Sequence, residues 1–222
     1  MALYIGSTKI KDLYLGSTKM KQAYLGSTLV YSSSHYTPNQ VLYESSTGGA
    51  STTLNLLDDG KYQVICIAGG GGGAGARPSV VGTSGSAGGG SGSGFDCVFQ
   101  LTAGNYSIAV GSGGASKTNG TATTGGDSRF GTCYARGGTG GKATRSSTSV
   151  STTRGSGGAS PTLTYTRTTT TLNTAGNNGS TGTDSASGGS AVYSSYGKGG
   201  NGHPTSPTAG TAGYVKVVYK GA

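Results

Sequence analysis

The sequence predicts an all-β chain, in which an N-terminal module of short-strand repeats precedes a glycine-rich, β-sandwich-like domain with long Gly, Ser and Thr loops. Runs of glycine directly follow strand-like segments, as where 62–68 leads into 69–73. No stretch sustains an apolar period of 3.6 residues, so long helices are not expected. The chain has 46 glycines, no Trp and 32% hydrophobic residues, which is too few for an ordinary aliphatic core.

A ten-residue repeat fills the N-terminus, over 3–10, 13–20 and 23–30. Each unit combines a short strand, a Gly-Ser-Thr turn and a second short strand. Three such units bury little apolar surface alone, so they need neighbours. We expect 1–31 to form a docking or oligomerisation module; the alternative is a plain sheet packed on the next domain. The residues expected to make its contacts are Leu3, Tyr4, Ile5, Leu13, Tyr14, Leu15, Tyr24 and Leu25.

A polar, Pro-containing stretch follows these repeats and predicts a linker over residues 32–50. The second domain is then expected to span 51–222. Its first strands, 53–57 and 61–68, flank Asp58-Asp59-Gly60, a favourable turn sequence. The sequence therefore predicts a hairpin at this position.

Three further strand segments follow in the second domain. Residues 95–101 alternate apolar and polar side chains and return as 106–110, which predicts another hairpin. Residues 129–136 predict a single strand. The closing segment 214–220 is a strong strand that we expect to pair back into the sheet.

Long polar segments separate these strands, at about 74–94, 112–128, 139–191 and 197–212. Connections of this length within a compact domain are usually functional or disordered. Because binding residues concentrate on loops held by a scaffold, we expect partner contacts in these segments.

The net charge of +9 lies entirely in the glycine-rich part. Residues 1–60 hold four Lys and four acidic residues, whereas 61–222 hold twelve basic residues against three acidic ones. This field favours an anionic partner such as nucleic acid, lipopolysaccharide phosphate or teichoic acid. The alternative is that the charge only keeps a Ser- and Thr-rich domain soluble.

Catalytic and metal chemistry find little support in the sequence. The spacing of Cys66, Cys97 and Cys133 fits no zinc pattern, so we expect buried free thiols, with a disulfide as the alternative. Only two histidines exist, and the seven acidic residues are scattered. The Gly70-x-Gly72-x-x-Gly75 match to a dinucleotide fingerprint lacks the helix which that motif requires. We therefore expect no enzyme, no metal and no cofactor.

Targeting signals are also missing from the sequence. The N-terminus has no apolar h-region, and no run approaches the 18–20 apolar residues of a membrane span. We expect synthesis in the cytoplasm without a signal peptide, and no membrane insertion.

The order of parts over roughly 54–222 resembles the glycine-rich domain of tailed-phage fibre and minor tail proteins. The resemblance rests on a strand entering a Gly run, the pattern Phe95-x-x-x-Phe99-x-Leu101 with its partner Tyr106-x-Ile108-x-Val110-Gly111, and the final Gly-Tyr-Val-x-Val-x-Tyr strand. It is also similar to tail-fibre tip adhesins, in which stacked polyglycine II helices support receptor-binding loops. The Leu-Tyr-x-Gly-Ser-Thr repeats resemble N-terminal segments of phage structural proteins.

This resemblance implies a virion protein, a tail fibre or tail-tip adhesin that binds an anionic glycan on the host surface without catalysis. A purely architectural head-fibre or decoration protein is the alternative, and a cationic nucleic-acid binder is a less favoured third. The N-terminal repeats would contact other virion proteins, and a homo-oligomer, with a trimer favoured, is expected. The host partner would be a surface polysaccharide or protein.

Receptor contacts are expected in the polar segments. Tyrosines there could stack on sugar rings, although packing among the glycines explains them equally well. Basic side chains could pair with phosphate or carboxylate groups. The candidate residues are Arg145, Arg154, Tyr165, Arg167, Tyr193, Tyr196, Lys198 and His203.

Overall fold

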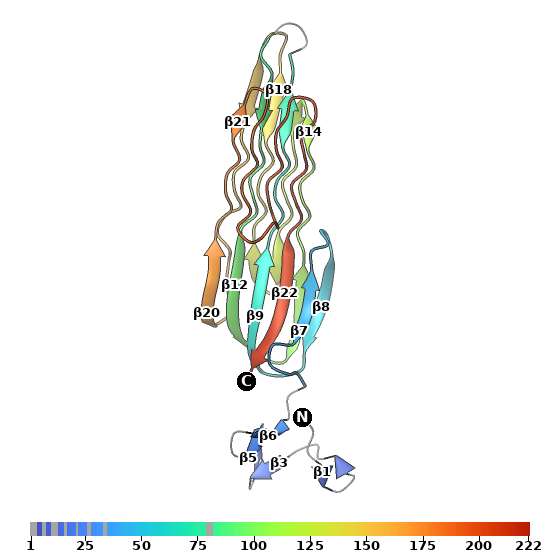
Figure 1. Ribbon diagram of the computed structural model, residues 1–222, viewed down its shortest axis with the longest axis vertical. Helices are drawn as coiled ribbons and strands as arrows, with labels where there is room; N and C mark the ends of the chain where they lie inside the picture. The colour runs from blue at the N-terminus through green and yellow to red at the C-terminus, as the bar shows by residue number, and fades with distance from the viewer. Residues whose placement is uncertain are drawn as a thin grey trace.

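The computed structural model describes residues 4–5, 8–9, 13–15, 17–20, 22–25, 28–32, 35–78 and 82–222. Within them the regular structure is all β, as predicted, with several antiparallel sheets and no helix. Along the long axis of Figure 1, N-terminal hairpins, a two-sheet sandwich, a bundle of wavy glycine segments and a small strand-containing tip follow one another. The tip and the hairpins lie at opposite ends.

Each ten-residue repeat forms a separate two-stranded antiparallel hairpin, as its strand–turn–strand pattern predicts. In all three hairpins the last residue of the first strand pairs with the Thr that opens the second strand. The hairpins are β1 (Tyr4–Ile5) with β2 (Thr8–Lys9), β3 (Leu13–Leu15) with β4 (Thr18–Met20), and β5 (Gln22–Leu25) with β6 (Thr28–Ser32).

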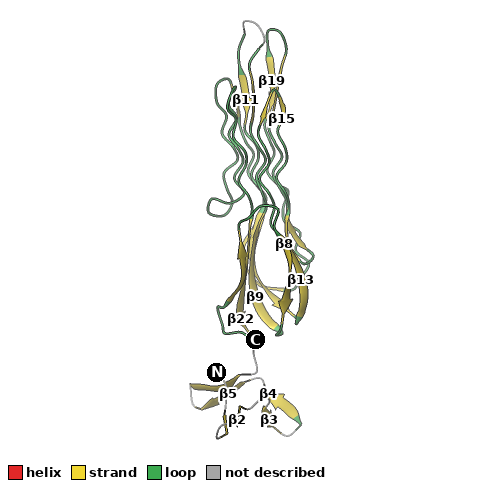
Figure 2. Cartoon of the chain, turned by 90° about the vertical axis from the view of Figure 1, so that its right-hand side faces the viewer, coloured by secondary structure: helices red, strands yellow, loops and turns green. Residues whose placement is uncertain are grey.

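The sandwich consists of two sheets that face each other, as the side view in Figure 2 shows. The first sheet has the order β20 (Arg167–Thr174), β12 (Gly94–Leu101), β9 (Gly60–Ile67), β22 (Tyr214–Gly221) and β7 (Val41–Ser45). The second has the order β17 (Cys133–Ala135), β16 (Ser128–Phe130), β13 (Gly104–Ala109) and β8 (Ser51–Leu56). The closing strand β22 pairs with β9 and β7, as predicted for 214–220.

Both predicted hairpins of this domain are wrong, because each turn crosses from one sheet to the other. Strand β9 pairs with β12, and β8 pairs with β13. A hairpin would set the apolar faces of consecutive strands side by side, whereas the crossing sets them opposite each other across the core. Tyr62 and Phe99 of the first sheet thus share one buried cluster with Leu56 and Ile108 of the second.

The predicted strand 129–136 is likewise two strands, β16 and β17, which form a tight hairpin. Gly131 lies at its turn with φ of 56°, a left-handed conformation that favours glycine. The turn returns Cys133 to the position opposite Phe130, and both side chains are buried in the core.

The three cysteines are buried free thiols, as predicted. Burial raises the pKa of the Cys66 thiol above its usual range, and burial also raises that of Cys97. Protonated thiols of this kind pack as small hydrophobes.

The segment predicted as a linker is partly built into the sandwich. Residues 41–45 form β7 at the edge of the five-stranded sheet, antiparallel to β22. Just before it, the Tyr36 ring packs on Tyr62 and Tyr219, with ring centroids 6.5 and 5.4 Å away. The sandwich therefore includes chain from about residue 35 onward.

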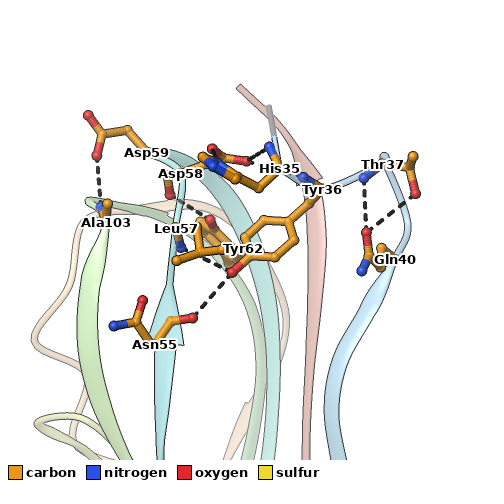
Figure 3. Close-up of polar contacts among 10 residues, drawn as sticks. All are labelled: His35, Tyr36, Thr37, Gln40, Asn55, Leu57, Asp58, Asp59, Tyr62 and Ala103. Carbon is orange, nitrogen blue, oxygen red and sulfur yellow. Dashed lines mark hydrogen bonds and ion pairs between the residues drawn. The ribbon is translucent and has the colours of Figure 1, made fainter. Parts of the chain in front are cut away.

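Asp58 anchors the entry of the chain into the sandwich, as Figure 3 shows. Its carboxylate accepts the backbone N–H groups of His35 at 2.6 Å and Tyr36 at 3.2 Å, and lies 2.8 Å from His35 Nδ1. The Tyr36 hydroxyl accepts the N–H of Leu57 and donates to the carbonyl of Asn55. The chain that leads from the hairpins is thereby held against the base of the sandwich.

The glycine segments form a lattice in which backbone hydrogen bonds join neighbouring segments. Along 69–73, the N–H groups of Gly69 and Gly72 donate to Gly126 and Thr123, three residues apart. Gly70 and Gly73 donate to segment 208–211, and Gly71 donates to segment 88–93. A direction that recurs every third residue is that of a left-handed, three-residue-per-turn extended helix, which has no internal hydrogen bonds. These contacts indicate polyglycine II packing.

Two lattice segments are central, because each is hydrogen-bonded to six others. The bonds of 69–73 reach 88–93, 114–117, 123–126, 138–141, 198–201 and 208–211. The bonds of 88–93 reach 68–71, 136–139, 155–158, 177–180, 189 and 197–200. Close approach of this kind requires glycine: a Cβ on Gly71 would overlap the carbonyl oxygen of Thr139.

Side-chain oxygens satisfy the N–H groups that point outward from the lattice. Thr139 Oγ1 accepts the N–H of Ser156 at 2.7 Å, and Thr123 Oγ1 accepts that of Ala115 at 2.6 Å. Ser128 lies at the buried junction with the sandwich, where its hydroxyl accepts the Gly111 N–H and donates to the Ile67 carbonyl. The Ser and Thr residues between the glycines thus supply hydrogen bonds that the lattice geometry leaves unpaired.

Candidate binding surface at the distal tip

The tip is built from short strands that continue the lattice segments. One sheet has the order β14 (Lys117–Thr118), β10 (Ala74–Ala76), β11 (Gly85–Ala87) and β21 (Thr181–Gly182). The other has the order β15 (Gly120–Thr121), β18 (Lys142–Arg145) and β19 (Val150–Thr153). A small core of Ala74, Ala76, Ala122 and Ala143 packs between them.

A shallow open groove of about 360 Å³ lies on this tip. Hydroxyl groups and backbone dominate its lining, with Val150 as the one aliphatic side chain. Such a lining offers both donors and acceptors to a polyhydroxylated ligand. The lining residues are Thr83, Ser84, Gly85, Thr148, Ser149, Val150, Thr152, Thr181, Gly182 and Thr183.

Charge divides along the long axis of the described chain. The ion pairs of Asp58, Asp127 and Glu44 all lie on the sandwich or its junction with the lattice. In the distal half, exposed basic side chains face a single acidic one, Asp184, so the tip carries net positive charge. The basic residues there are Arg77, Lys117, Lys142, Arg145 and Arg154.

Three of the predicted receptor-binding residues lie in this distal part. Arg145 ends β18, and its N–H donates to the side chain of Asn119 on the neighbouring turn. Arg154 follows β19 and is exposed. His203 lies beyond the lattice segment that ends at 202, where its Nδ1 accepts the N–H of Ser206 at 3.2 Å.

Tyr165 and Arg167 lie on the sandwich, which the lattice separates from the tip. The Tyr165 ring packs edge-on against Phe99 and Phe130, and its hydroxyl accepts the Thr132 N–H. Packing therefore explains this tyrosine without a sugar. Arg167 begins the edge strand β20, opposite Phe99.

Tyr193 and Tyr196 form a stack on Tyr214 at the end of the sandwich next to the lattice. The Tyr196 and Tyr214 rings lie 4.4 Å apart and 8° from parallel; Tyr193 stacks at 6.2 Å and 13°. Burial, and then the hydrogen bond to Glu44, raise the pKa of Tyr214. That bond, together with Lys216, lowers the pKa of Glu44. Lys198 is exposed on the lattice just beyond this stack.

Sequence reasoning missed three basic residues of the tip, Arg77, Lys117 and Lys142, and the threonines of the groove. A usable signal was present in the alternation of the glycine runs. Because the chain runs up and down the lattice, the turns between runs fall alternately at the sandwich and at the tip. Residues 74–78, 82–87, 117–121, 142–153, 181–186 and 203–207 therefore gather at one end.

The predicted docking residues lie on the N-terminal hairpins, except Leu3, which is outside the described residues. Leu15 on β3 is 74% exposed. Leu13 on the same strand is half-buried. The other predicted residues, Tyr4, Ile5, Tyr14, Tyr24 and Leu25, are strand positions of the same three hairpins.

Side chains of the kinds that bind metal ions are scattered over the described chain. Its His, Cys, Asp and Glu side chains form no group of three that could hold a metal ion. Nor does this part of the chain contain a helix long and apolar enough to cross a membrane.

The glycine-rich part of the chain matches a known family. No curated protein matches the sequence. Residues 45–222 match the glycine-rich domain family; they include the lattice, the tip and every strand of the sandwich except β7, of which only Ser45 lies in the match. The chain belongs to this family.

Proposed function

We propose that the chain is a structural protein of a phage virion, a tail fibre or tail-tip adhesin, whose distal tip binds an anionic glycan on the host surface without catalysis. The observation that carries the proposal is the placement of a basic, hydroxyl-lined tip at the end of a rigid lattice, opposite the N-terminal hairpins. The phage assignment rests on the resemblance of the strand, glycine-run and repeat patterns to tail fibre proteins.

The tip chemistry favours a charged polysaccharide. Guanidinium and ammonium groups of Arg77, Lys142 and Arg145 can pair with phosphate or carboxylate groups, which are attracted over about 10 Å at 0.1 M salt. Threonine and serine hydroxyls of the groove can exchange hydrogen bonds with sugar hydroxyls. Backbone pairing within the lattice holds these loops in place, so little ordering entropy is lost on binding.

In this proposal the lattice supports the tip, and the opposite end of the chain attaches the protein to the particle. A spacer of hydrogen-bonded segments carries the tip away from the sandwich, and Asp58 holds the incoming chain at the sandwich base. The lattice would thus act as a spacer between the tip, which contacts the host surface, and the end of the chain that is attached to the particle. We propose that the N-terminal hairpins form this attachment to the particle.

Binding of the full chain to purified phosphate-rich envelope polysaccharide tests the proposal. We expect saturable binding that weakens at least tenfold in the double variant Lys142→Ala/Arg145→Ala. The matched control, Lys61→Ala/Lys220→Ala, removes the same charge from the sandwich end and should bind as the parent does. Equal losses in the two variants would indicate non-specific attraction and would contradict a tip site.

Two further measurements, of incorporation into particles and of DNA binding, distinguish the other candidate functions. A chain that is incorporated into particles but binds no host cell or polysaccharide would be an architectural head-fibre or decoration protein. Binding to DNA of any sequence, with a steep loss of affinity as salt rises, would indicate a cationic nucleic-acid binder.

A further inference from the structure

Arg129 on β16 (Ser128–Phe130) carries a charge that the fold does not pair. Its Nε is the only buried side-chain nitrogen or oxygen among the described residues that makes no hydrogen bond. The side chain is half-buried, and none of the ion pairs of the described chain includes it. A guanidinium stays protonated at neutral pH, so Arg129 cannot become neutral to avoid the cost of burial. A group of this kind needs an acceptor from elsewhere.

The nearest carboxylate along the strand is already used. Asp127 Oδ2 accepts a hydrogen bond from Arg136 Nη1 at 2.7 Å, and its Oδ1 accepts the N–H of Gly137 at 2.9 Å. The Arg136 guanidinium also lies over the ring of Tyr134, 5.1 Å from the ring centroid. The group therefore holds two guanidinium ions for one carboxylate, and Arg129 is the one left without a partner.

Arg129 belongs to the outer face of the four-stranded sheet, on the side of the sandwich away from β9 and β22 in Figure 2. Its chain neighbours Ser128 and Phe130 are fully buried, so alternation along the strand directs Arg129 outward. Across the sheet it lies between Tyr134 of β17 and Ala109 of β13. Because Ala109 ends at Cβ, no long side chain from β13 lies over Arg129 at this position.

Beyond Ala109 the same face presents three hydroxyl groups. Ser51 on β8 lies opposite Ala109, and Thr53 lies opposite Ser107 of β13. Ser51 and Thr53 are exposed and Ser107 is half-buried, and none of these hydroxyls is hydrogen-bonded to a described residue. Two strand spacings, about 10 Å, separate Arg129 on β16 from the hydroxyls of β8. A short saccharide spans this distance.

We propose that this face binds a carboxylated sugar, with the sugar carboxylate on Arg129 and the sugar hydroxyls on the serines and threonine of β8 and β13. A planar guanidinium matches a carboxylate in shape and charge. Hydroxyl side chains both donate and accept, as a sugar requires. The site lies on the sandwich and is separate from the tip groove. It goes beyond the proposed function and depends neither on glycan binding at the tip nor on the assignment to a phage.

Other anionic partners fit this face less well. The cores of protein interfaces are enriched in aromatic and apolar side chains, whereas this face continues from its hydroxyls to the hydrogen-bonded amides of Asn55 and Asn105, 2.9 Å apart. A phosphate carries more charge than a carboxylate, and only Arg129 is free to meet it, because Arg136 is paired with Asp127.

Titration of the full chain with D-glucuronate, followed by NMR of the arginine Nε–H groups, tests the site. We expect saturable binding that shifts the Arg129 signal, and no shift with glucose, the neutral counterpart. Arg129→Gln should weaken glucuronate binding by about tenfold or more, because a charge-assisted contact is lost. Arg167→Gln removes the same charge from an exposed position on the other sheet and should bind as the parent does. Equal affinities of Arg129→Gln and the parent would overturn the proposal.

The same titration identifies the class of ligand and its location. Acetate that binds as tightly as glucuronate would show that the hydroxyls contribute nothing and would overturn the assignment to a sugar. Inorganic phosphate that binds more tightly than glucuronate would overturn the assignment to a carboxylate. The tip variant Lys142→Ala/Arg145→Ala should keep its glucuronate affinity. Loss of binding in that variant, with parent-like binding in Arg129→Gln, would place the ligand at the tip and contradict this inference alone.

Thermal unfolding provides a second readout. Arg129→Met replaces the charge with an apolar side chain, so without ligand it should unfold at or above the temperature of the parent. Glucuronate should raise the unfolding temperature of the parent, since it binds only the folded chain, and should leave that of Arg129→Met unchanged. A variant that unfolds well below the parent would mean that Arg129 supports the fold, and the ligand site would be ruled out.

Discussion

Gly71 donates its backbone N–H to the carbonyl oxygen of Gly90 at 2.9 Å, which joins the two central segments of the lattice. A Cβ on Gly71 would overlap the backbone of the neighbouring segment at Thr139. Hydrogen bonding between the segments therefore depends on glycine, because segments can come this close only where no Cβ lies between them.

Gly71→Ala should therefore destabilise the domain strongly. Overpacking of a dense interior costs about 1–3 kcal/mol and sometimes more, and here the overlapping atoms are backbone that cannot rotate away. We expect a clear fall in the urea midpoint. Gly120→Ala is the matched control, because its Cβ would meet only the flexible side chain of Lys117, at 3.2 Å. If both variants unfold at the same urea concentration, the lattice is not closely packed at Gly71.

Ser128→Ala should destabilise the junction between sandwich and lattice. The fully buried Ser128 hydroxyl accepts the Gly111 N–H at 2.8 Å and donates to the Ile67 carbonyl at 2.7 Å. Its removal takes the acceptor from the buried Gly111 N–H and one donor from the Ile67 carbonyl, at a cost of about 1–3 kcal/mol. Thermal unfolding measures this loss, with the exposed Ser112→Ala as a control that should change stability little.

Asp58→Ala should release the chain that enters the base of the sandwich. Two backbone N–H groups, of His35 and Tyr36, lose their acceptor. We expect faster amide hydrogen exchange at these two residues, while exchange in the lattice stays slow. Asp184→Ala removes an exposed carboxylate at the tip and serves as the control. Unchanged exchange at residues 35 and 36 would mean that Asp58 does not hold this segment.

Stability should also depend on Glu44 at acid pH. The hydrogen bond from Tyr214, with further help from Lys216, lowers the pKa of Glu44 below its ordinary value of 4.5 in the folded state. A depressed carboxyl pKa gives a stabilising contribution that is present above pH 4.5 and is lost as pH falls through the folded-state pKa. The melting temperature of Glu44→Gln should therefore fall less than that of the parent as pH drops from 6 to 3. Parallel curves for the two proteins would exclude this contribution.

The strands were predictable from sequence, but their partners were not. Alternating apolar residues mark β9, β12 and β22 clearly. The turn at Asp58-Asp59-Gly60 suits a hairpin, yet its chemistry suits a crossing between sheets equally well. Only burial of both apolar faces across one core decides between these arrangements, and that is a property of the whole domain.

The lattice was harder to predict, because its order carries no side-chain pattern. Its hydrogen bonds join segments distant in sequence, so runs such as 88–93 resemble loops when taken alone. For the same reason, the residues predicted to form one receptor-binding site lie in two separate parts of the structure. Arg145 and His203 fall at the tip, whereas Tyr165, Tyr193 and Tyr196 are packed against other aromatic rings of the sandwich.

The recurrence of hydrogen-bond direction every third residue imposes a reading frame on the lattice. Deleting one residue from 69–73 would turn each later N–H by about a third of a revolution, away from its acceptor and toward a different neighbour. Insertions and deletions within the runs should therefore be tolerated only in triplets. The turns at the tip carry no such frame, so their lengths can change one residue at a time while the stalk beneath them stays in register.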